Sequence, residues 1–227
     1  MNDFFWLHIK KAGGESFRKT FTPPYVQTDK VDNCRPFIAL PKEEWNDALN
    51  NYRIPLGDYD YKRMLFAKKF LFTPEEFDNM FKFVIVRNPY DRAVSCWKYF
   101  YGYQNISKLI TNPRNYYKKL SFQYFLEQLP REWEHKHHRA LATHTASMWS
   151  DITDRNGKLL VDKILKLENM SDNIDFLNKK LNINIKEFSH INKSRSDNSY
   201  QKYYNKKTRK IVERYYRDDI ENLGYKF

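Results

Sequence analysis

The chain has 227 residues, enough to bury a sizeable core, and we expect residues 1–227 to form a single α/β domain. Lysine and arginine outnumber aspartate and glutamate by 40 to 28, so the net charge of +12 indicates an anionic partner, although an AT-rich genome would produce the same excess. Two cysteines exclude a disulfide framework, and no apolar run reaches membrane-spanning length or resembles a signal peptide, so we expect a cytoplasmic protein.

Predicted strands and helices alternate along the chain. Strands are predicted at residues 4–8, 63–67, 82–86 and 159–165. Helices are predicted at residues 14–20, after Pro41, after the N-cap residue Thr73, from Pro89, after the N-cap residue Ser171, and at residues 206–222. This alternation indicates an α/β fold, a P-loop-like doubly wound sheet of mostly parallel strands flanked by helices.

The sequence HIKKAGGES, residues 8–16, joins the first predicted strand to the first predicted helix. Its two glycines let the backbone approach a ligand closely, and the N-terminus of a helix presents N–H groups to an anion. Lys11 adds a positive charge and Ser16 adds a hydroxyl donor. The motif therefore predicts a phosphate cradle, although its lysine precedes the glycines and it matches neither GxxxxGK[ST] nor GxGxxG.

A second motif, FVIVRNPYDRAVS, covers residues 83–95. It places Arg87 at the carboxyl end of a predicted strand and Ser95 about two helical turns further on. In doubly wound sheets the ligand crevice lies at the carboxyl ends of the strands. A guanidinium and a hydroxyl group at that edge can hold a second phosphate.

Together the two motifs resemble those of the sulfotransferase superfamily, in its carbohydrate, membrane-associated branch. The first motif of that branch commonly reads His-Ile-Pro-Lys-Thr-Gly-Gly-Thr-Ser, and the second reads approximately Phe-x-Val-Arg-Asn-Pro-Tyr-Asp-Arg-x-Val-Ser. The likeness continues through VDKILKLEN at residues 161–169, HINKSRS at residues 190–196 and the ending YYRDDIENLGYKF. The chain departs from the first motif at three positions, where Lys10, Ala12 and Glu15 replace proline and two threonines.

The resemblance implies 3′-phosphoadenosine 5′-phosphosulfate as the sulfuryl donor, with no metal ion. The acceptor it implies is a hydroxyl group of a saccharide or of another molecule, which can itself be anionic. Residues that would bind the 5′-phosphosulfate, several of them through backbone N–H groups, are Lys11, Gly13, Gly14, Glu15, Ser16 and Phe17. The 3′-phosphate would be held by Arg87 and Ser95, and a later loop would close over the donor with Asn192, Ser194 and Arg195.

The reaction needs a cation at the leaving group and a base for the acceptor hydroxyl. Lys11 can meet the charge that develops on the bridging oxygen. Many relatives carry a histidine after the second strand, but this chain has FAKK at residues 66–69, so the candidate bases are Lys68, His138 and His144. We expect His8 to orient the loop or to pack beside the donor, and Asp91 and Arg92 to fix the loop–helix junction. We do not expect the HKHHR cluster at residues 135–139 to bind metal.

Three alternative functions remain open. A sulfotransferase-like protein that binds nucleotide without turnover is compatible with Glu15 and with the missing histidine. A P-loop-like kinase would use ATP, but the lysine placement and the Arg87–Ser95 pair argue against it. A nucleic-acid-binding module follows from charge alone and does not account for the two motifs, so we expect no nucleic-acid partner.

Overall fold

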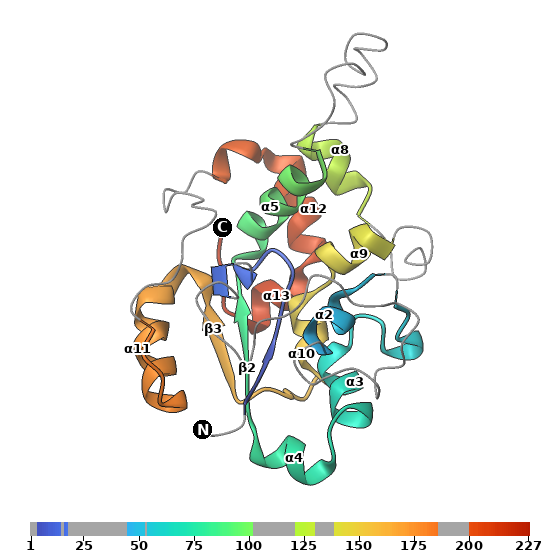
Figure 1. Ribbon diagram of the computed structural model, residues 1–227. Coiled ribbons are helices and arrows are strands. Elements are labelled where there is room, and N and C mark those ends of the chain that lie inside the picture. The colour runs from blue at the N-terminus through green and yellow to red at the C-terminus, as the bar shows by residue number, and fades with distance from the viewer. Residues whose placement is uncertain are drawn as a thin grey trace.

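The computed structural model describes residues 4–14, 16–17, 45–52, 54–101, 121–129, 139–185 and 200–227 (Figure 1). The strands are β1 (Phe4–Leu7), β2 (Phe81–Val86) and β3 (Lys163–Lys166). The helices before β3 are α2 (Trp45–Asn50), α3 (Arg63–Phe70), α4 (Pro74–Asn79), α5 (Pro89–Tyr101), α8 (Phe122–Glu127), α9 (Arg139–Thr145) and α10 (Met148–Ile152). Those after it are α11 (Met170–Leu181), α12 (Lys206–Tyr215) and α13 (Arg217–Asn222), with 3-10 turns at η3 (Gly57–Tyr59), η5 (Leu167–Asn169) and η6 (Gln201–Tyr203).

The described strands form one parallel sheet in the order β1-β2-β3. Leu7 is paired with Val84, and Val86 with Lys166, so the carboxyl ends of all three strands lie at one edge. The parallel part of the sheet prediction is confirmed. The described sheet contains no reversal of strand order, so its doubly wound character is not confirmed.

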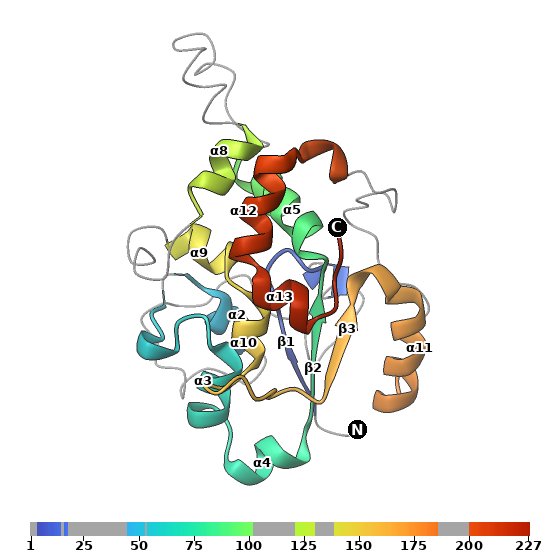
Figure 2. The same ribbon diagram turned by 180° about the vertical axis from the view of Figure 1, so that it is seen from behind.

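Helices cover both faces of this sheet, because alternate strand residues point to opposite sides. Phe5 and Leu7 join the core that contains α2, α3, α4 and α10. Phe4 and Trp6 join a second core with α11, on the other side of the sheet in Figures 1 and 2. Burial on both faces explains why β1 and β2 read as nearly continuous apolar runs.

A third apolar cluster lies beyond the carboxyl edge of the sheet. There α5, α8 and α12 pack around Val94, Phe125 and Val212 (Figure 2). Tyr216 completes this cluster with its ring fully buried. The cluster fixes α5 against the C-terminal helices, and so fixes the second motif.

Two helix starts were predicted correctly in detail. Thr73 and Glu76 form a reciprocal capping box at the start of α4. Asn88 accepts a hydrogen bond from the N–H of Tyr90 at 3.0 Å, with Pro89 as the first residue of α5.

Three predicted elements were wrong in type or extent. Residues 63–67 belong to helix α3, not to a strand: the run is short and rich in helix formers, and it buries Met64 and Ala67 three positions apart. The strand predicted at 159–165 begins only at Lys163, because Leu159 pairs antiparallel with Thr153. The predicted final helix divides at Tyr216 into α12 and α13.

Candidate functional site

The loop after β1 and the start of α5 meet at the carboxyl edge of the sheet. Arg87, the residue after β2, donates from Nη1 to the carbonyl oxygen of Lys11 at 3.2 Å. This bond directly joins the two sequence motifs, which are about 75 residues apart in the chain. Their predicted proximity is confirmed.

Three arginines from other parts of the chain donate hydrogen bonds to backbone carbonyl oxygens of the loop. Arg63 donates to His8 O at 3.2 Å, and Arg92 donates from Nε to Lys10 O at 3.0 Å. With Arg87 on Lys11 O, three of four successive carbonyls are held by guanidinium groups. Held carbonyls restrict the rotation of the peptide planes, so the loop is ordered before a ligand binds.

The glycines of the loop are required by close packing. Gly13 has a φ of +82°, and a Cβ there would lie 2.6 Å from Cδ1 of Leu167. A Cβ on Gly14 would lie 1.9 Å from Nε2 of His8, so the imidazole occupies the space of a side chain. In the described part of the chain, the N–H groups of both glycines have no hydrogen-bond partner. They are therefore available to an anion at the start of the first helical turn.

The His8 side chain packs between Trp6 and the glycines of the loop. Its ring is 6% exposed and stacks on the indole of Trp6, with centroids 5.2 Å apart and planes at 24°. Contact with Gly14 fixes the ring on its other side. His8 therefore packs inside the loop, which is compatible with a role in orienting it.

Arg63 also bonds two residues outside the loop. It is 3% exposed and forms a two-point ion pair with Asp151, which is 0% exposed on α10. Its Nη1 also bonds Asn50 at the end of α2. This network was not predicted from the sequence, because Arg63 was expected in a strand and no local pattern connects it to residue 151.

One face of α5 runs along the loop. Asp91, Ser95 and Tyr99 are spaced by four residues, so their side chains lie above one another on that face. Asp91 accepts from both Nε and Nη2 of Arg87 at 2.8 Å, which fixes the guanidinium. Nζ of Lys11 lies 4.5 Å from the ring centroid of Tyr99. Ser95 lies on the same face of α5, four residues from each of Asp91 and Tyr99, and is half-buried.

His144 of α9 completes this cluster. Its imidazole stacks on the ring of Tyr99, with centroids 4.7 Å apart and planes at 18°. Burial, together with the charges of Lys10, Lys11 and Arg92, lowers the pKa of His144 to about 4, despite the opposing effect of a hydrogen bond to Ala140 O. That bond joins Nδ1 to a carbonyl at 2.7 Å, so Nδ1 carries the proton and Nε2 keeps its lone pair.

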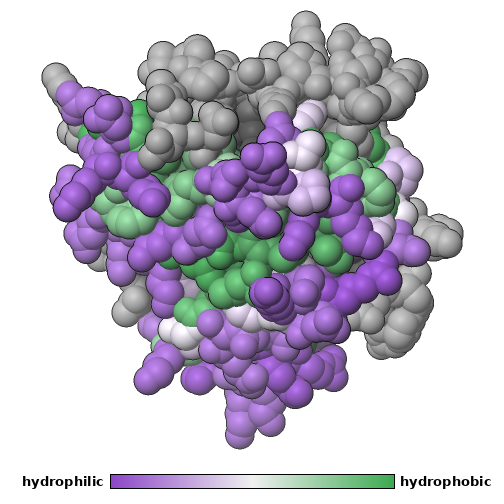
Figure 3. Space-filling model, turned by 90° about the horizontal axis from the view of Figure 1, so that it is seen from below, coloured by the Kyte–Doolittle hydropathy of each residue, from purple (hydrophilic) through white to green (hydrophobic). Residues whose placement is uncertain are grey.

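Lys68, another candidate base, lies far from the loop. Lys68 is exposed on the last turn of α3, with Nζ 5.4 Å from the ring centroid of Phe77 in α4. Because α4 leads into the amino end of β2, Lys68 lies at the opposite end of the sheet from the loop (Figure 1). Figure 3 views the molecule from that end, which is mostly hydrophilic around a hydrophobic strip. The structure does not bring Lys68 together with Lys11.

Phe17 and Ser16 belong to the first helical turn after the loop. The N–H of Phe17 donates to Gly13 O at 3.0 Å, and its ring is fully buried against Trp6. The structure therefore does not offer the N–H of Phe17 to a ligand, because the helix itself uses it. Ser16 is half-buried. The remaining predicted site residues lie outside the described residues: Glu15, His138, Asn192, Ser194 and Arg195.

The later segments that carry the family resemblance also contact the second motif. Glu168, after β3, accepts from the N–H of Asn88 at 2.6 Å and from the hydroxyl of Tyr225 at 3.0 Å. Nδ2 of Asn88 donates to Lys226 O at 3.1 Å. Residues of LEN and of the C-terminal YKF thus hold the turn between β2 and α5.

No group of three His, Cys, Asp or Glu side chains within the described ranges is placed to bind a metal ion. None of the described helices is long and apolar enough to cross a membrane.

Comparison with protein families gives one match that covers nearly the whole chain. The model described as "Sulfotransferase family" matches residues 1–226. Comparisons with curated proteins and with solved structures gave no significant match.

Proposed function

The chain belongs to the sulfotransferase family, and from this membership we propose that it transfers a sulfuryl group from 3′-phosphoadenosine 5′-phosphosulfate to a hydroxyl group of a saccharide. The observation that carries the proposal is the bond between Arg87 and Lys11 O, which brings both motifs to one edge of the sheet. Separate cations and N–H donors at that edge suit a ligand with anionic groups at two positions.

The residues divide into two sets for the two ends of the donor. We assign Lys11, Ser16 and the N–H groups of Gly13 and Gly14 to the 5′-phosphosulfate, because they surround the first helical turn. We assign Arg87 and Ser95 to the 3′-phosphate. Asp91 orients Arg87 and also reduces the net charge there, so Ser95 is needed as a second donor. The assignments of Glu15, Asn192, Ser194 and Arg195 follow from the resemblance alone.

Lys11 has the central role in the chemistry. The donor supplies an activated sulfur–oxygen bond when bound, and transfer leaves negative charge on the bridging oxygen. The ammonium group of Lys11 stabilises that charge electrostatically. Its φ of +63° places it in the left-handed region, a strained conformation for a non-glycine residue and one often found at functional sites. Arg87 holds that conformation through the carbonyl oxygen of Lys11.

Of the three candidate bases, we propose His144 for the acceptor proton. It lies one aromatic ring away from Lys11, whereas Lys68 lies at the far end of the sheet. With its pKa near 4, the imidazole is neutral at pH 7 and can accept a proton at Nε2. The negative charge of a bound donor favours the imidazolium that forms.

Replacing His144 with glutamine tests this assignment. We expect kcat to fall by about 100- to 10,000-fold, the usual contribution of general-base catalysis, while the dissociation constant of 3′-phosphoadenosine 5′-phosphate stays within about twofold of wild type. Unchanged kcat would remove His144 from the mechanism.

The same variant has a predictable effect on stability. The folded pKa of His144 lies below the ordinary value of 6.5, so the folded protein binds fewer protons than the unfolded chain below that pH. Wild-type stability therefore falls as the pH drops from about 6.5 towards 4, with a loss from this group of roughly 2 kcal/mol at pH 5. Urea unfolding at pH 7 and pH 5 measures this effect. The free energy of unfolding of wild type should fall between the two pH values by about this amount more than that of His144→Gln.

Calorimetric titration of nucleotides, without added metal, tests the donor site. Wild type should bind 3′-phosphoadenosine 5′-phosphate much more tightly than AMP, ADP or ATP. Arg87→Ala should weaken the 3′-phosphorylated nucleotide about tenfold or more and AMP much less, because a charge-assisted phosphate contact is lost. Since AMP binds the same loop, it serves as the internal control.

The titration also separates the alternatives. No preference for the 3′-phosphate would overturn the proposal and favour a kinase or a nucleic-acid-binding protein. If Arg87→Ala lost equal affinity for 3′-phosphoadenosine 5′-phosphate and for AMP, Arg87 would act only by positioning the loop. Tight binding of 3′-phosphoadenosine 5′-phosphate without transfer to any member of a saccharide panel would favour nucleotide binding without turnover.

A further inference from the structure

The most basic described segment lies outside both motifs. Residues 200–217 contain seven lysines and arginines, and Glu213 is their only acid. The segment forms η6 and α12. The donor site uses none of these cations, so the proposed function leaves this charge unexplained.

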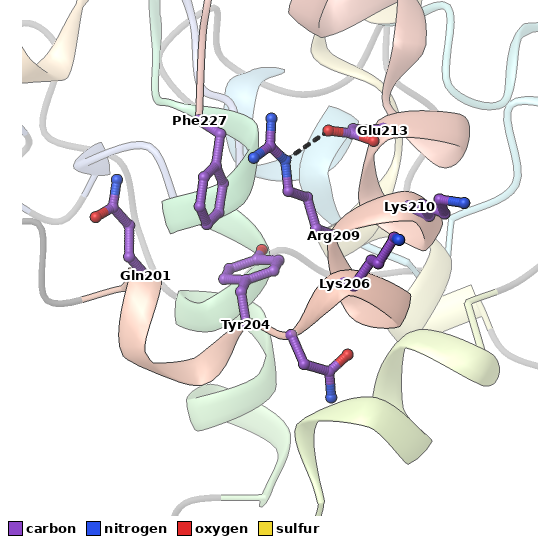
Figure 4. A pocket seen from close by; sticks show the side chains of 8 residues that line it. Gln201, Tyr204, Lys206, Arg209, Lys210, Glu213 and Phe227 are labelled. Carbon is purple, nitrogen blue, oxygen red and sulfur yellow. Dashed lines mark hydrogen bonds and ion pairs between the residues drawn. The ribbon is translucent and has the colours of Figure 1, made fainter.

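A hollow of about 510 Å³ opens on this segment (Figure 4). Its lining residues come from η6, from α12 with its N-cap, and from the C-terminal end of the chain: Gln201, Tyr204, Asn205, Lys206, Arg209, Lys210, Glu213 and Phe227. We call this hollow the α12 groove. Its volume is within the range of small-ligand sites, about 300–1,000 Å³.

The floor of the α12 groove is aromatic and closely packed. The rings of Tyr204 and Phe227 meet edge to face with centroids 5.3 Å apart, and Tyr90 contacts both. The hydroxyl of Tyr204 donates to Tyr90 O at 2.8 Å. Because these rings are held by one another, the floor is rigid and its aromatic surface is largely used within the protein.

The rim supplies the charge. Arg209 lies with Cζ 4.5 Å from the ring centroid of Phe227 and pairs with Glu213 at 2.7 Å, so its guanidinium is fixed. Lys206 and Lys210 are exposed, four residues apart on the same side of α12 (Figure 4). Neither lysine has a hydrogen bond or ion pair to any part of the chain that the structure describes.

From these contacts we propose that the α12 groove is a second anion-binding site that takes the sulfate or carboxylate groups of an anionic saccharide chain. The fixed guanidinium of Arg209 and the two exposed ammonium groups of Lys206 and Lys210, all on one helix (Figure 4), suit anionic groups spaced along a chain. Single-stranded nucleic acid needs open aromatic faces on which bases stack, and here the rings contact one another. The choice of a saccharide rests on the proposed sulfuryl transfer.

The groove is separate from the donor site. All of its lining residues lie in residues 201–213 or at Phe227, and none belongs to either motif. Tyr90, in the first turn of α5, connects the groove with the donor site. Its ring contacts Phe227 of the groove, and it follows Arg87 of the donor site by three residues in the chain. A saccharide in the groove therefore does not compete with the donor for the same residues.

Binding of a heparin hexasaccharide, measured by calorimetry at two salt concentrations, tests the proposal. We expect Lys206→Ala/Lys210→Ala to bind it about tenfold more weakly than wild type and to reduce the salt dependence of binding. The matched control is Lys158→Ala/Lys179→Ala. It removes the same charge from two exposed lysines whose side-chain ammonium groups have no hydrogen bond or ion pair to the described chain, and its affinity for the hexasaccharide should fall by less than about twofold.

Three results would overturn the proposal. The first is an equal loss in the control variant, which would mean that net charge alone attracts the saccharide. The second is unchanged binding in Lys206→Ala/Lys210→Ala. The third is tighter binding of hexaglutamate or of a thymidine hexanucleotide than of the hexasaccharide, which would indicate a different occupant.

A parallel titration with 3′-phosphoadenosine 5′-phosphate keeps this result apart from the proposed function. The groove variant should bind that nucleotide as wild type does. If wild type binds the hexasaccharide through the groove and does not bind the nucleotide, the proposed sulfuryl transfer fails and the anion site remains.

Discussion

Lys11→Ala is expected to lower kcat for sulfuryl transfer by about 100- to 1,000-fold, the usual cost of removing one preorganised group that stabilises transition-state charge. The proposed function makes Lys11 the cation nearest the leaving oxygen. The geometry supports this role, since Lys11 lies between the loop glycines and the face of α5 that carries Ser95 and Tyr99.

The fold should survive this substitution. The side chain of Lys11 is half-buried at the edge of the sheet, and the carbonyl oxygen that Arg87 binds remains in the alanine variant. Lysine and alanine meet the same steric cost at a φ of +63°, so the loop gains no new strain. We expect the midpoint of urea unfolding to stay close to that of wild type. A loss of turnover in this variant would then not be caused by unfolding.

Lys68→Ala provides the matched control. It removes one lysine from α3 at the opposite end of the sheet, and should leave turnover unchanged. The assay follows transfer of ³⁵S from labelled donor to the saccharide that wild type accepts. Wild-type turnover in Lys11→Ala would exclude Lys11 from the mechanism, and a large loss in Lys68→Ala would restore Lys68 as a candidate base.

Arg63→Met is expected to destabilise the fold by about 3–5 kcal/mol, because it leaves Asp151 buried without its partner. Asp151 is 0% exposed and accepts from Nε and Nη2 of Arg63, as well as from its backbone N–H at 3.4 Å. A domain of this size has only about 5–15 kcal/mol of stability in total, so the variant should be close to unfolding.

A double variant separates stability from loop positioning. In Arg63→Met/Asp151→Leu both charges are replaced by apolar side chains, which often restores much of the lost stability. His8 O still lacks the bond that Arg63 supplies, so the loop should remain less ordered. We therefore expect the double variant to fold and to bind 3′-phosphoadenosine 5′-phosphate more weakly than wild type.

The control for these variants is Arg214→Met on the exposed side of α12, which should change stability by less than about 0.5 kcal/mol. Urea unfolding followed by tryptophan fluorescence gives the free energies, and calorimetry gives the nucleotide affinity. Wild-type affinity in the folded double variant would show that Arg63 has a role in stability only.

Sequence patterns correctly predicted that the two motifs lie side by side. HIKKAGGES and FVIVRNPYDRAVS each follow a buried strand, and parallel strands have their carboxyl ends at the same edge. The contact between Arg87 and Lys11 O follows from that rule, and so does the place of Ser95, which needs only the period of a helix. Caps at Thr73 and Asn88 are equally local, because a few neighbouring residues satisfy the free N–H groups of a helix start.

The tertiary structure alone decided which residues surround Lys11. Tyr99 and His144 meet through the packing of α9 on α5, and Arg63 reaches His8 through a buried pair with Asp151. These contacts join elements 45 to 90 residues apart, where no sequence period relates one side chain to another. Lys68 shows how one wrong element changes a site prediction. A strand was expected at residues 63–67, but the run forms α3 and packs Met64 and Ala67 into the core. This packing places Lys68 at the end of the sheet opposite the loop.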